Sequence, residues 1–465
     1  MKKIKYILAT TLSLIAILAL AIPVFAAPPG SWVTDFTLFN LSKTNSATIT
    51  IKRYSTCATG CSTDTGTVVK LNDSIPSGGS YYYNPASDPT FPTSFSGSMA
   101  IESDQPLAGT VTIANNLTGS AYASDAYGAV TAPEATNYLP IVLRMSAWST
   151  RITVQNASAS ATNVTIHYIG AGAPSDTLIT GLPANMMAMV DLSDMGALSF
   201  NGSATVISTN PVGIVVEEYK TTGGVLITYN GVPASDIATT VYMPGFIGQG
   251  AWATDFTIVN TESTSANISV TFAGSTKTLS GSIPGNSSVY INGYAGVYPA
   301  GWTGSAPTTG YYGAASVTST KNIVIAYNEA NSGGGPGNLQ SGYLGFPASE
   351  ASSSVVVPLV ENLYSTGWVT TFSVQSIDGT PANLTLTYSG NLTPLCNPCT
   401  YNMPAGVSAH TFNQQSDGHV PQHFLGGVTI NSNKPIVVIA DQTNTLSTTY
   451  AGGDSLAGFV GIVAP

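Results

Sequence analysis

Four cysteines in two close pairs are the residues whose type and spacing most directly suggest chemistry. Cys57 and Cys61 lie in one short segment, and Cys396 and Cys399 form a Cys-x-x-Cys sequence. A redox-active pair normally lies at a helix N-terminus, which lowers the thiol pKa, but here the pair follows the strand-like sequence 384–388 (LTLTY). In an exported chain we therefore expect disulfides. Three connectivities are open, of which the two local bonds are favoured by proximity.

Histidines and carboxylates give a weaker indication of a metal site. His410, His419 and His423 lie near Asp417 in a loop-rich stretch. Zinc ligands usually have tighter, ordered spacing, so a surface loop is the favoured interpretation. No cofactor is expected.

Calcium binding at the junctions between repeats is an open alternative. Asp35 and Asp255 occupy the same place in two of the four repeats described below, whereas Arg151 and Thr371 replace them in the other two. A calcium role throughout the chain is therefore unsupported.

A short block near the end of the chain, Gly453-Asp-Ser-Leu456, resembles the block of GDSL hydrolases. In that family the block opens the domain and its histidine and aspartate lie far downstream, whereas here the chain ends soon afterwards. The repeats align it with the segments 233–236 and 347–350, which indicates a loop. No nucleophile with its base and no paired carboxylates can be placed, so the chain is predicted not to be an enzyme.

Aromatic residues offer a binding surface in one expanded loop. Trp302 lies in the sequence YPAGW, and Tyr311 and Tyr312 follow it. Exposed aromatic side chains stack on sugar rings and are common binding anchors, so these three residues are a candidate glycan contact. The competing interpretation is that the loop covers a hydrophobic edge of its repeat.

The elements that must position these residues recur four times, at intervals of about 105–115 residues, the length of one small domain. A strand that alternates between apolar and polar residues opens each repeat, as in WATDFTIVN. One face of such a strand is expected in a core, which makes its tryptophan a core anchor rather than a ligand platform. The four anchors are Trp32, Trp148, Trp252 and Trp368.

Further strands follow in each repeat. The first and second are expected to form a hairpin. A later Gly-led hairpin is expected to turn at a Ser-x-x-Pro sequence such as Ser208-Thr-Asn-Pro211. The fold class is therefore all-β, with four tandem immunoglobulin-like β-sandwich modules joined by short linkers into a stiff rod or arc. The expected modules are residues 27–140, 141–244, 245–358 and 359–465.

The N-terminus has the form of an export signal. Lys2, Lys3 and Lys5 precede a mostly apolar stretch and a small-residue cleavage site at Ala26, so residues 1–26 are expected to be a signal peptide. No later stretch is long enough to span a membrane. The net charge of −10 argues against nucleic acid and anionic membranes as partners. We expect a secreted protein.

The repeat pattern W-x-T-x-φ-x-φ … A-x-φ-T-φ-x-Y … G-S-A-x-φ-x-S-x-x-P (φ, apolar) resembles tandem sandwich repeats of secreted bacterial surface proteins, of the envelope-layer and adhesin-stalk type. The resemblance implies a non-enzymatic structural protein of a cell-surface layer, sheath or extracellular filament. The chain ends at Pro465, the match of Pro140, Pro244 and Pro358, and two interpretations are open: the first module is an ordinary cap and the chain is a free monomer, or the end of one copy docks on the start of another, head to tail. The alternative is an adhesin or glycan-binding stalk that uses the Trp302 loop.

Overall fold

The chain folds almost entirely into β-strands, which confirms the predicted all-β class. The computed structural model describes residues 17–18, 31–57, 61–196, 199–293, 296–308, 310–331, 339–365, 367–444 and 453–463. No helix in these ranges is long and apolar enough to cross a membrane. The predicted signal peptide lies outside them, except for the backbone of β1 (Ile17–Leu18), which pairs with β6 (Gly97–Ser103).

The second unit shows how each repeat folds. The first half of its long strand β14 pairs with β11 and β9, and the second half pairs with β10 and β15. The eight-stranded sheet therefore folds back on itself into two layers, with the apolar core between them. The strands are β9 (Glu134–Met145), β10 (Trp148–Asn156), β11 (Thr162–Ile169), β12 (Thr177–Leu182), β13 (Met187–Asp191), β14 (Phe200–Lys220), β15 (Leu226–Asn230) and β16 (Val232–Pro233).

Local sequence explains why these segments are strands. Along β11, Val164, Ile166 and Tyr168 are buried, and the residues between them are more exposed. This alternation follows the two-residue period of a strand with one face in a core. Branched and aromatic side chains also suit a pleated, half-buried surface.

Both predicted hairpins are wrong. β10 and β11 do not pair with each other, because they lie in opposite layers. At the Ser-x-x-Pro sequence the chain bends and continues from one layer into the other as a single strand. Ser208 Oγ donates to Asn210 O at 2.6 Å, and Pro211 has no N–H for the first layer's hydrogen-bond ladder. The unit is therefore one folded sheet rather than the two separate sheets of an immunoglobulin-like sandwich.

The other units repeat this plan. Unit 1 differs in that two strands, β6 and β7, take the place of the long strand, so that its layers are separate sheets. Its strands are β2 (Trp32–Asn40), β3 (Ala47–Ser55), β4 (Thr67–Ile75), β5 (Ser80–Tyr83), β6, β7 (Leu107–Asn115) and β8 (Ser124–Gly128).

Units 3 and 4 have long strands, β23 and β31, like β14 of unit 2. Unit 3 contains β17 (Ala238–Gln249), β18 (Trp252–Asn260), β19 (Ala266–Phe272), β20 (Thr278–Ile283), β21 (Ser287–Asn292), β22 (Thr303–Gly304), β23 (Tyr311–Asn331), β24 (Leu339–Leu344) and β25 (Phe346–Pro347). Unit 4 contains β26 (Ser352–Tyr364), β27 (Trp368–Ser376), β28 (Asn383–Gly390), β29 (Cys399–Asn402), β30 (Ala409–Asn413), β31 (Phe424–Thr443), β32 (Leu456–Val460) and β33 (Ile462–Val463).

The change from one unit to the next comes earlier than the expected module limits. β9, β17 and β26 begin before residues 140, 244 and 358, and each pairs with strands of the unit that follows. The 3-10 helices η4 (Ala234–Asp236) and η5 (Ala348–Glu350) form the links before β17 and β26.

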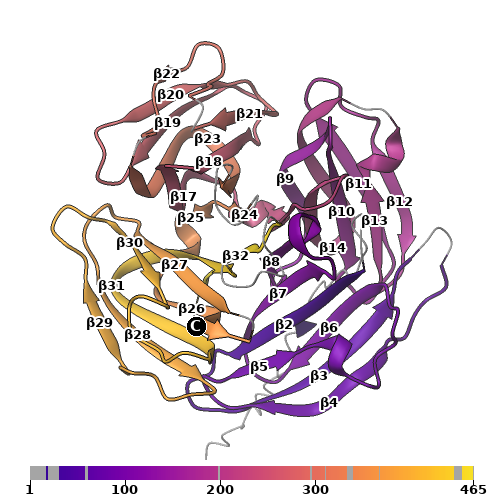
Figure 1. Ribbon diagram of the computed structural model, residues 1–465. Coiled ribbons are helices and arrows are strands. Elements are labelled where there is room, and N and C mark those ends of the chain that lie inside the picture. Colours follow the sequence, from indigo (N-terminus) through magenta and orange to yellow (C-terminus); the bar gives the residue numbers. More distant parts are fainter. Residues whose placement is uncertain are drawn as a thin grey trace, which may run out of the picture.

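The four units form a closed ring, not the expected rod or arc (Figure 1). The last strand of each unit's inner layer lies at the centre. β8 lies against β15 and β32, and β24 lies against the same two strands. Towards the outside, β9 packs on unit 3, β17 packs on unit 4, and β26 of unit 4 packs on β2 and β7 of unit 1.

The seam between units 4 and 1 closes the ring. Phe39 and Ala108 pack in a buried cluster with Val356, and Ile462 packs against it. Closer to the centre, the backbone N–H of Asp454 donates to Tyr122 O at 2.8 Å, and that of Ser124 donates to Asp454 O at 3.0 Å. The end of the chain is thereby held against its own first unit.

Packing at the centre leaves no room for a side chain at Gly458 of β32. A Cβ added at Gly458 would meet Ser341 Oγ and the ring of Tyr343. We predict that Gly458→Ala lowers the free energy of unfolding by about 1–3 kcal/mol, the usual cost of overpacking. Gly128→Ala on β8 is the matched control, since its Cβ would lie 3.6 Å from its nearest neighbours. Urea unfolding measures both; equal stability of the two variants would contradict the close packing of β32.

Candidate functional site

The centre of the ring is organised by one carboxyl group, that of Asp125 on β8. Its Oδ1 accepts hydrogen bonds from Ser341 Oγ of unit 3 and from the backbone N–H of Gly458 of unit 4, both at 2.8 Å. Its Oδ2 accepts from the backbone N–H and, at 3.1 Å, the hydroxyl of Thr228 of unit 2. One side chain of unit 1 thus contacts all three other units.

A second buried aspartate, Asp454, lies just before β32, the central strand of unit 4. Its Oδ1 accepts from the backbone N–H of Gln340 at 2.9 Å, and its Oδ2 accepts from that of Leu226 at 3.4 Å. Burial raises the pKa of Asp125 to about 8 and raises the pKa of Asp454 well above its usual range. Both acids accept hydrogen bonds from the surrounding units, so the centre joins units rather than offering a free base.

Acid pairs also lie across three of the four unit boundaries. Burial, followed by the charge of Asp35, raises the pKa of Glu361 to about 8 at the seam between units 4 and 1. Burial and then the charge of Asp255 raise the pKa of Glu218 well above its usual range at the boundary between units 2 and 3. Across the third boundary, burial and Asp441 do the same to Glu329.

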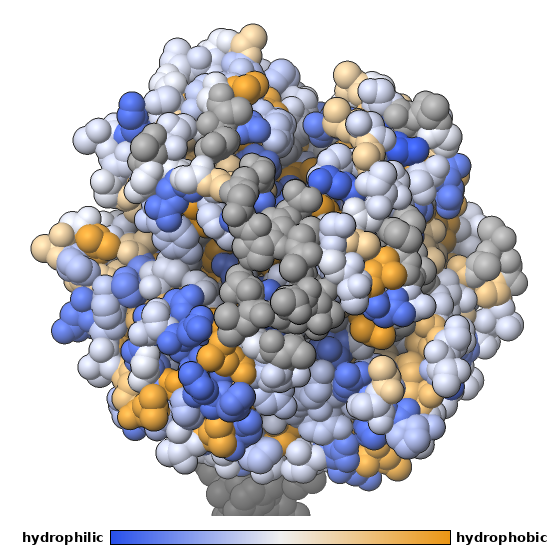
Figure 2. All heavy atoms as spheres, viewed as in Figure 1, coloured by the Kyte–Doolittle hydropathy of each residue, from blue (hydrophilic) through white to orange (hydrophobic). Residues whose placement is uncertain are grey.

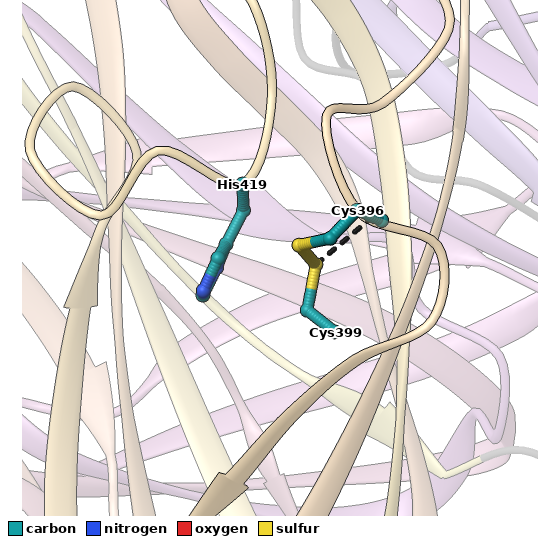
Figure 3. A group of neighbouring side chains, drawn as sticks. All are labelled: Cys396, Cys399 and His419. Carbon is teal, nitrogen blue, oxygen red and sulfur yellow. Dashed lines mark hydrogen bonds between the residues drawn. A yellow bond between two sulfur atoms is a disulfide. The ribbon is translucent and has the colours of Figure 1, made fainter.

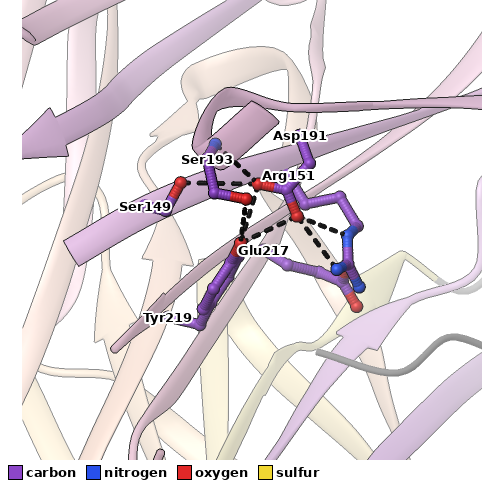
Figure 4. Close-up of polar contacts among 6 residues, drawn as sticks. All are labelled: Ser149, Arg151, Asp191, Ser193, Glu217 and Tyr219. Atoms are coloured by element: carbon purple, nitrogen blue, oxygen red, sulfur yellow. Dashed lines mark hydrogen bonds and ion pairs between the residues drawn. The ribbon is translucent and has the colours of Figure 1, made fainter. Parts of the chain in front are cut away.

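In unit 2, beside the boundary where Trp32 of unit 1 packs with Tyr219, a cation lies among acids (Figure 4). Arg151 Nη2 lies 2.9 Å from Asp191 Oδ2, and Arg151 Nη1 lies 3.7 Å from Glu217 Oε2. The hydroxyl of Tyr219 donates to Asp191 at 2.7 Å. The positive charge and the hydroxyl hold the pKa of Asp191 below its usual value although burial raises it.

A pocket of about 340 Å³ opens where the four central strands end. Each unit contributes the segment that follows its central strand, so the pocket lies on the ring axis and needs all four units. The lining segments are 128–132, 230–233, 344–347 and 460–463. Apolar walls with a few polar groups are the usual features of a small-ligand site, and this pocket is the best-formed candidate for one.

The cysteines form the two local pairs, Cys57 with Cys61 and Cys396 with Cys399. The ligand atoms of Cys396, Cys399 and His419 lie within 4.8 Å of one another (Figure 3). In the disulfide form the two sulfurs are not thiolates and cannot serve as zinc ligands. In the reduced form these three residues could hold a metal ion.

Of the histidines predicted as a cluster, His410 and His423 do not belong to this group of three. His410 Nδ1 lies 2.9 Å from the hydroxyl of Tyr401, and His419 Nδ1 lies 3.0 Å from that of Tyr388. Burial lowers the pKa of both imidazoles. Each of these two histidines is therefore held by a hydrogen bond with a tyrosine hydroxyl.

The three aromatic residues of the candidate glycan contact lie in different surroundings. Trp302 is half-buried against the unit 3 core, and a Cβ on Gly281 would meet its ring. Tyr311 also packs on that core and donates to Ala273 O at 2.9 Å. Tyr312 is 39 % exposed, and Glu329 and Asp441 raise its pKa, after burial, at the boundary with unit 4.

The repeat tryptophans differ in burial. Trp32 is 9 % exposed and packs with Tyr219 and Leu226 of unit 2. Trp148, Trp252 and Trp368 are partly exposed. They start their strands beside a tight turn, and the core is formed four residues further on, by Phe36, Ile152, Phe256 and Phe372.

Sequence reasoning missed both central aspartates. Asp454 lies in the block that resembles the GDSL sequence, and its carboxyl group bridges units 2 and 3. Ser455 Oγ donates to the carbonyl of Asn444 at 3.0 Å, as in a structural turn. The sign that could have revealed Asp125 is a single acid in a strand of small and aromatic residues (SDAYG).

Comparisons with known proteins give no family. No family model and no curated protein matches the chain. Among solved structures, a partial N-terminal region of enterococcal surface protein is 7 % identical, over 77 % of this chain and 90 % of that one, with a TM-score of 0.18. The B domain of a biofilm-associated protein is 7 % identical, over 76 % and 80 %, with a TM-score of 0.16. These scores are too low to support a shared fold or role.

The raised pKa values predict an unusual pH dependence. The pKa of Asp255 and that of Asp441 are raised to about 7, and those of Asp125 and Glu361 to about 8, mainly by burial. Between pH 5 and about 7 the unfolded chain has released these protons while the folded ring still holds at least half of them, so stability falls as pH rises through the raised pKa values. We expect the melting temperature to decrease from pH 5 to pH 8 in calorimetry.

The variant Glu218→Gln tests whether buried acids cause this pH dependence. Glutamine is a suitable replacement because Gln442 occupies the matching position in unit 4. This variant should lose part of the slope and gain stability at pH 8. A melting temperature that is constant or rises over the same range would show that the buried acids are ionised in the folded state.

Proposed function

We propose that this chain is an exported, non-enzymatic structural protein of the cell surface, a ring-shaped building block of a layer, sheath or extracellular filament. The observation that carries the proposal is the closure of the ring through Asp125. The carboxyl group of this residue bonds to the three other units and so holds the four units together. The disulfides suit an oxidising compartment. The low content of charged residues, 8 %, suits a surface that associates with others.

The proposed partner is a second copy of the chain, bound through the rim. β4 and β12 are edge strands on the outside of the ring (Figure 1). Leu71 on β4 is 65 % exposed and Leu178 on β12 is 68 % exposed. Open edges with apolar side chains favour strand pairing between molecules.

Unit 3 shows the opposite arrangement at the matching edge. β22 pairs with β20, and Trp302 lies on Gly281 of that strand, so the edge is covered and Leu279 is fully buried. The role proposed for Trp302 is therefore edge protection. On the face seen in Figure 2 the described residues show polar and apolar side chains mixed together, which favours the rim over this face.

Head-to-tail docking through the chain ends has less support. β33, the last strand, pairs with β26 of its own unit, and Ile462 packs on the first unit of the same chain. A polymer joined through these ends would first have to open the seam between units 4 and 1.

Rim association predicts a clear effect of charge on the two edge strands. We expect purified residues 27–465 to form sheets or filaments of four-lobed rings in negative-stain electron microscopy, and Leu71→Lys with Leu178→Lys to leave single rings. Leu395→Lys is the control, because Leu395 is equally exposed, at 65 %, but lies in a loop. Isolated wild-type rings at high concentration would contradict the proposal.

The alternative function, an adhesin that binds cell-surface glycans, is favoured by one cleft in unit 1. This cleft, of about 880 Å³, is lined by Trp32, Phe91 and Phe95 and also by Asp88. Aromatic rings beside an acid are a common setting for sugar recognition, and aromatic residues are frequent binding anchors.

A glycan array separates the two candidate sugar sites. If the cleft binds, Phe95→Ala should lower the signal at least tenfold while Trp302→Ala leaves it unchanged, because Trp302 covers an edge strand. A loss confined to Trp302→Ala would instead point to the loop of unit 3, and no signal from the wild-type chain would remove the adhesin alternative.

A further inference from the structure

The axial pocket contains hydrogen-bond acceptors without a positive charge to match. Asp236 and Glu350, from the links before β17 and β26, both line it. Burial, and then the neighbouring Asp236, raise the pKa of Glu350 to about 8. No lysine or arginine is among the described residues that line the pocket.

An amide oxygen adds to this acceptor set. Asn230 lines the pocket, and its Nδ2 donates to Gly128 O at 2.7 Å. Its Oδ1 is buried and has no hydrogen-bond partner among the residues that the structure describes. A buried acceptor without a donor costs free energy, so a ligand that brings an N–H group would gain by binding there.

The remaining walls are aliphatic and aromatic. Val232 is 5 % exposed and Phe346 is 4 % exposed, and Ile462 completes this side at the end of the chain. Such walls suit the body of an organic molecule. A bare divalent cation would need about six oxygen ligands, more than two carboxyl groups and one amide supply.

We propose that the axial pocket binds an alkylammonium ion, with the charged head between Asp236 and Glu350 and the aliphatic body against Val232 and Phe346. One N–H of the head would donate to Asn230 Oδ1. The ligand is either a free aliphatic amine or the side chain of a lysine on a partner protein, which offer the same chemistry. The site does not depend on the structural role proposed above.

Isothermal titration calorimetry with n-butylammonium chloride tests the site on the full chain. We expect saturable binding to the wild type and at least a tenfold loss in Glu350→Gln and in Asp236→Asn. Glu102→Gln, an acid in β6 that pairs with Lys52 at 2.7 Å outside the pocket, should bind as the wild type does. Ala132→Trp keeps both acids and should block binding at the pocket edge, where Ala132 is exposed.

The comparison ligands decide the outcome. Nα-acetyl-lysine amide distinguishes the two sources, because tight binding of this compound favours a lysine of a partner, and binding of n-butylammonium alone favours a free amine. The proposal is overturned if n-butanol binds equally well, if only calcium binds, if no ligand saturates, or if the acid variants fold normally by circular dichroism and bind unchanged.

Discussion

The fold depends on the hydrogen bonds that converge on the carboxyl group of Asp125. Four strands from four units can meet at one axis only if the polar groups that they bury there find partners. Small residues at this level, such as Gly342 and Gly458, let the backbones approach, and Asp125 supplies acceptors to three units at once. Without such an acceptor, the donors of Thr228 and Gly458 would be buried without partners.

The ring is built as two similar halves rather than four equivalent quarters. Gln155 and Gln375, in units 2 and 4, both donate to a carbonyl of the preceding unit, at 3.4 Å. At the matching positions of units 1 and 3, Phe39 and Val259 pack in apolar clusters across the boundary. At this one strand position, polar and apolar contacts therefore alternate around the ring, and the exchange of aspartate for arginine or threonine in the Trp strands follows the same alternation.

Much of the local structure could be predicted from the sequence, and the closed arrangement could not. The period of two along strands such as β11 depends on neighbouring residues, so the all-β class and the repeats were readable. The Ser-x-x-Pro sequence was read as a turn because the same chemistry serves turns and bends, and only the second layer decides between them. The central contacts join residues that are far apart in the sequence, such as Asp125 and Gly458, which are separated by 333 positions. No local sequence pattern predicts such contacts.

The long strands also determine how the units can come apart. β14, β23 and β31 each run through both layers, so neither layer can open without disturbing a strand that the other layer needs. Amide protons in these three units should therefore exchange with solvent in one cooperative step. Unit 1 lacks this coupling because β6 and β7 are separate strands in separate sheets. It is the unit whose layers can part independently, and so the place where the ring would begin to fray.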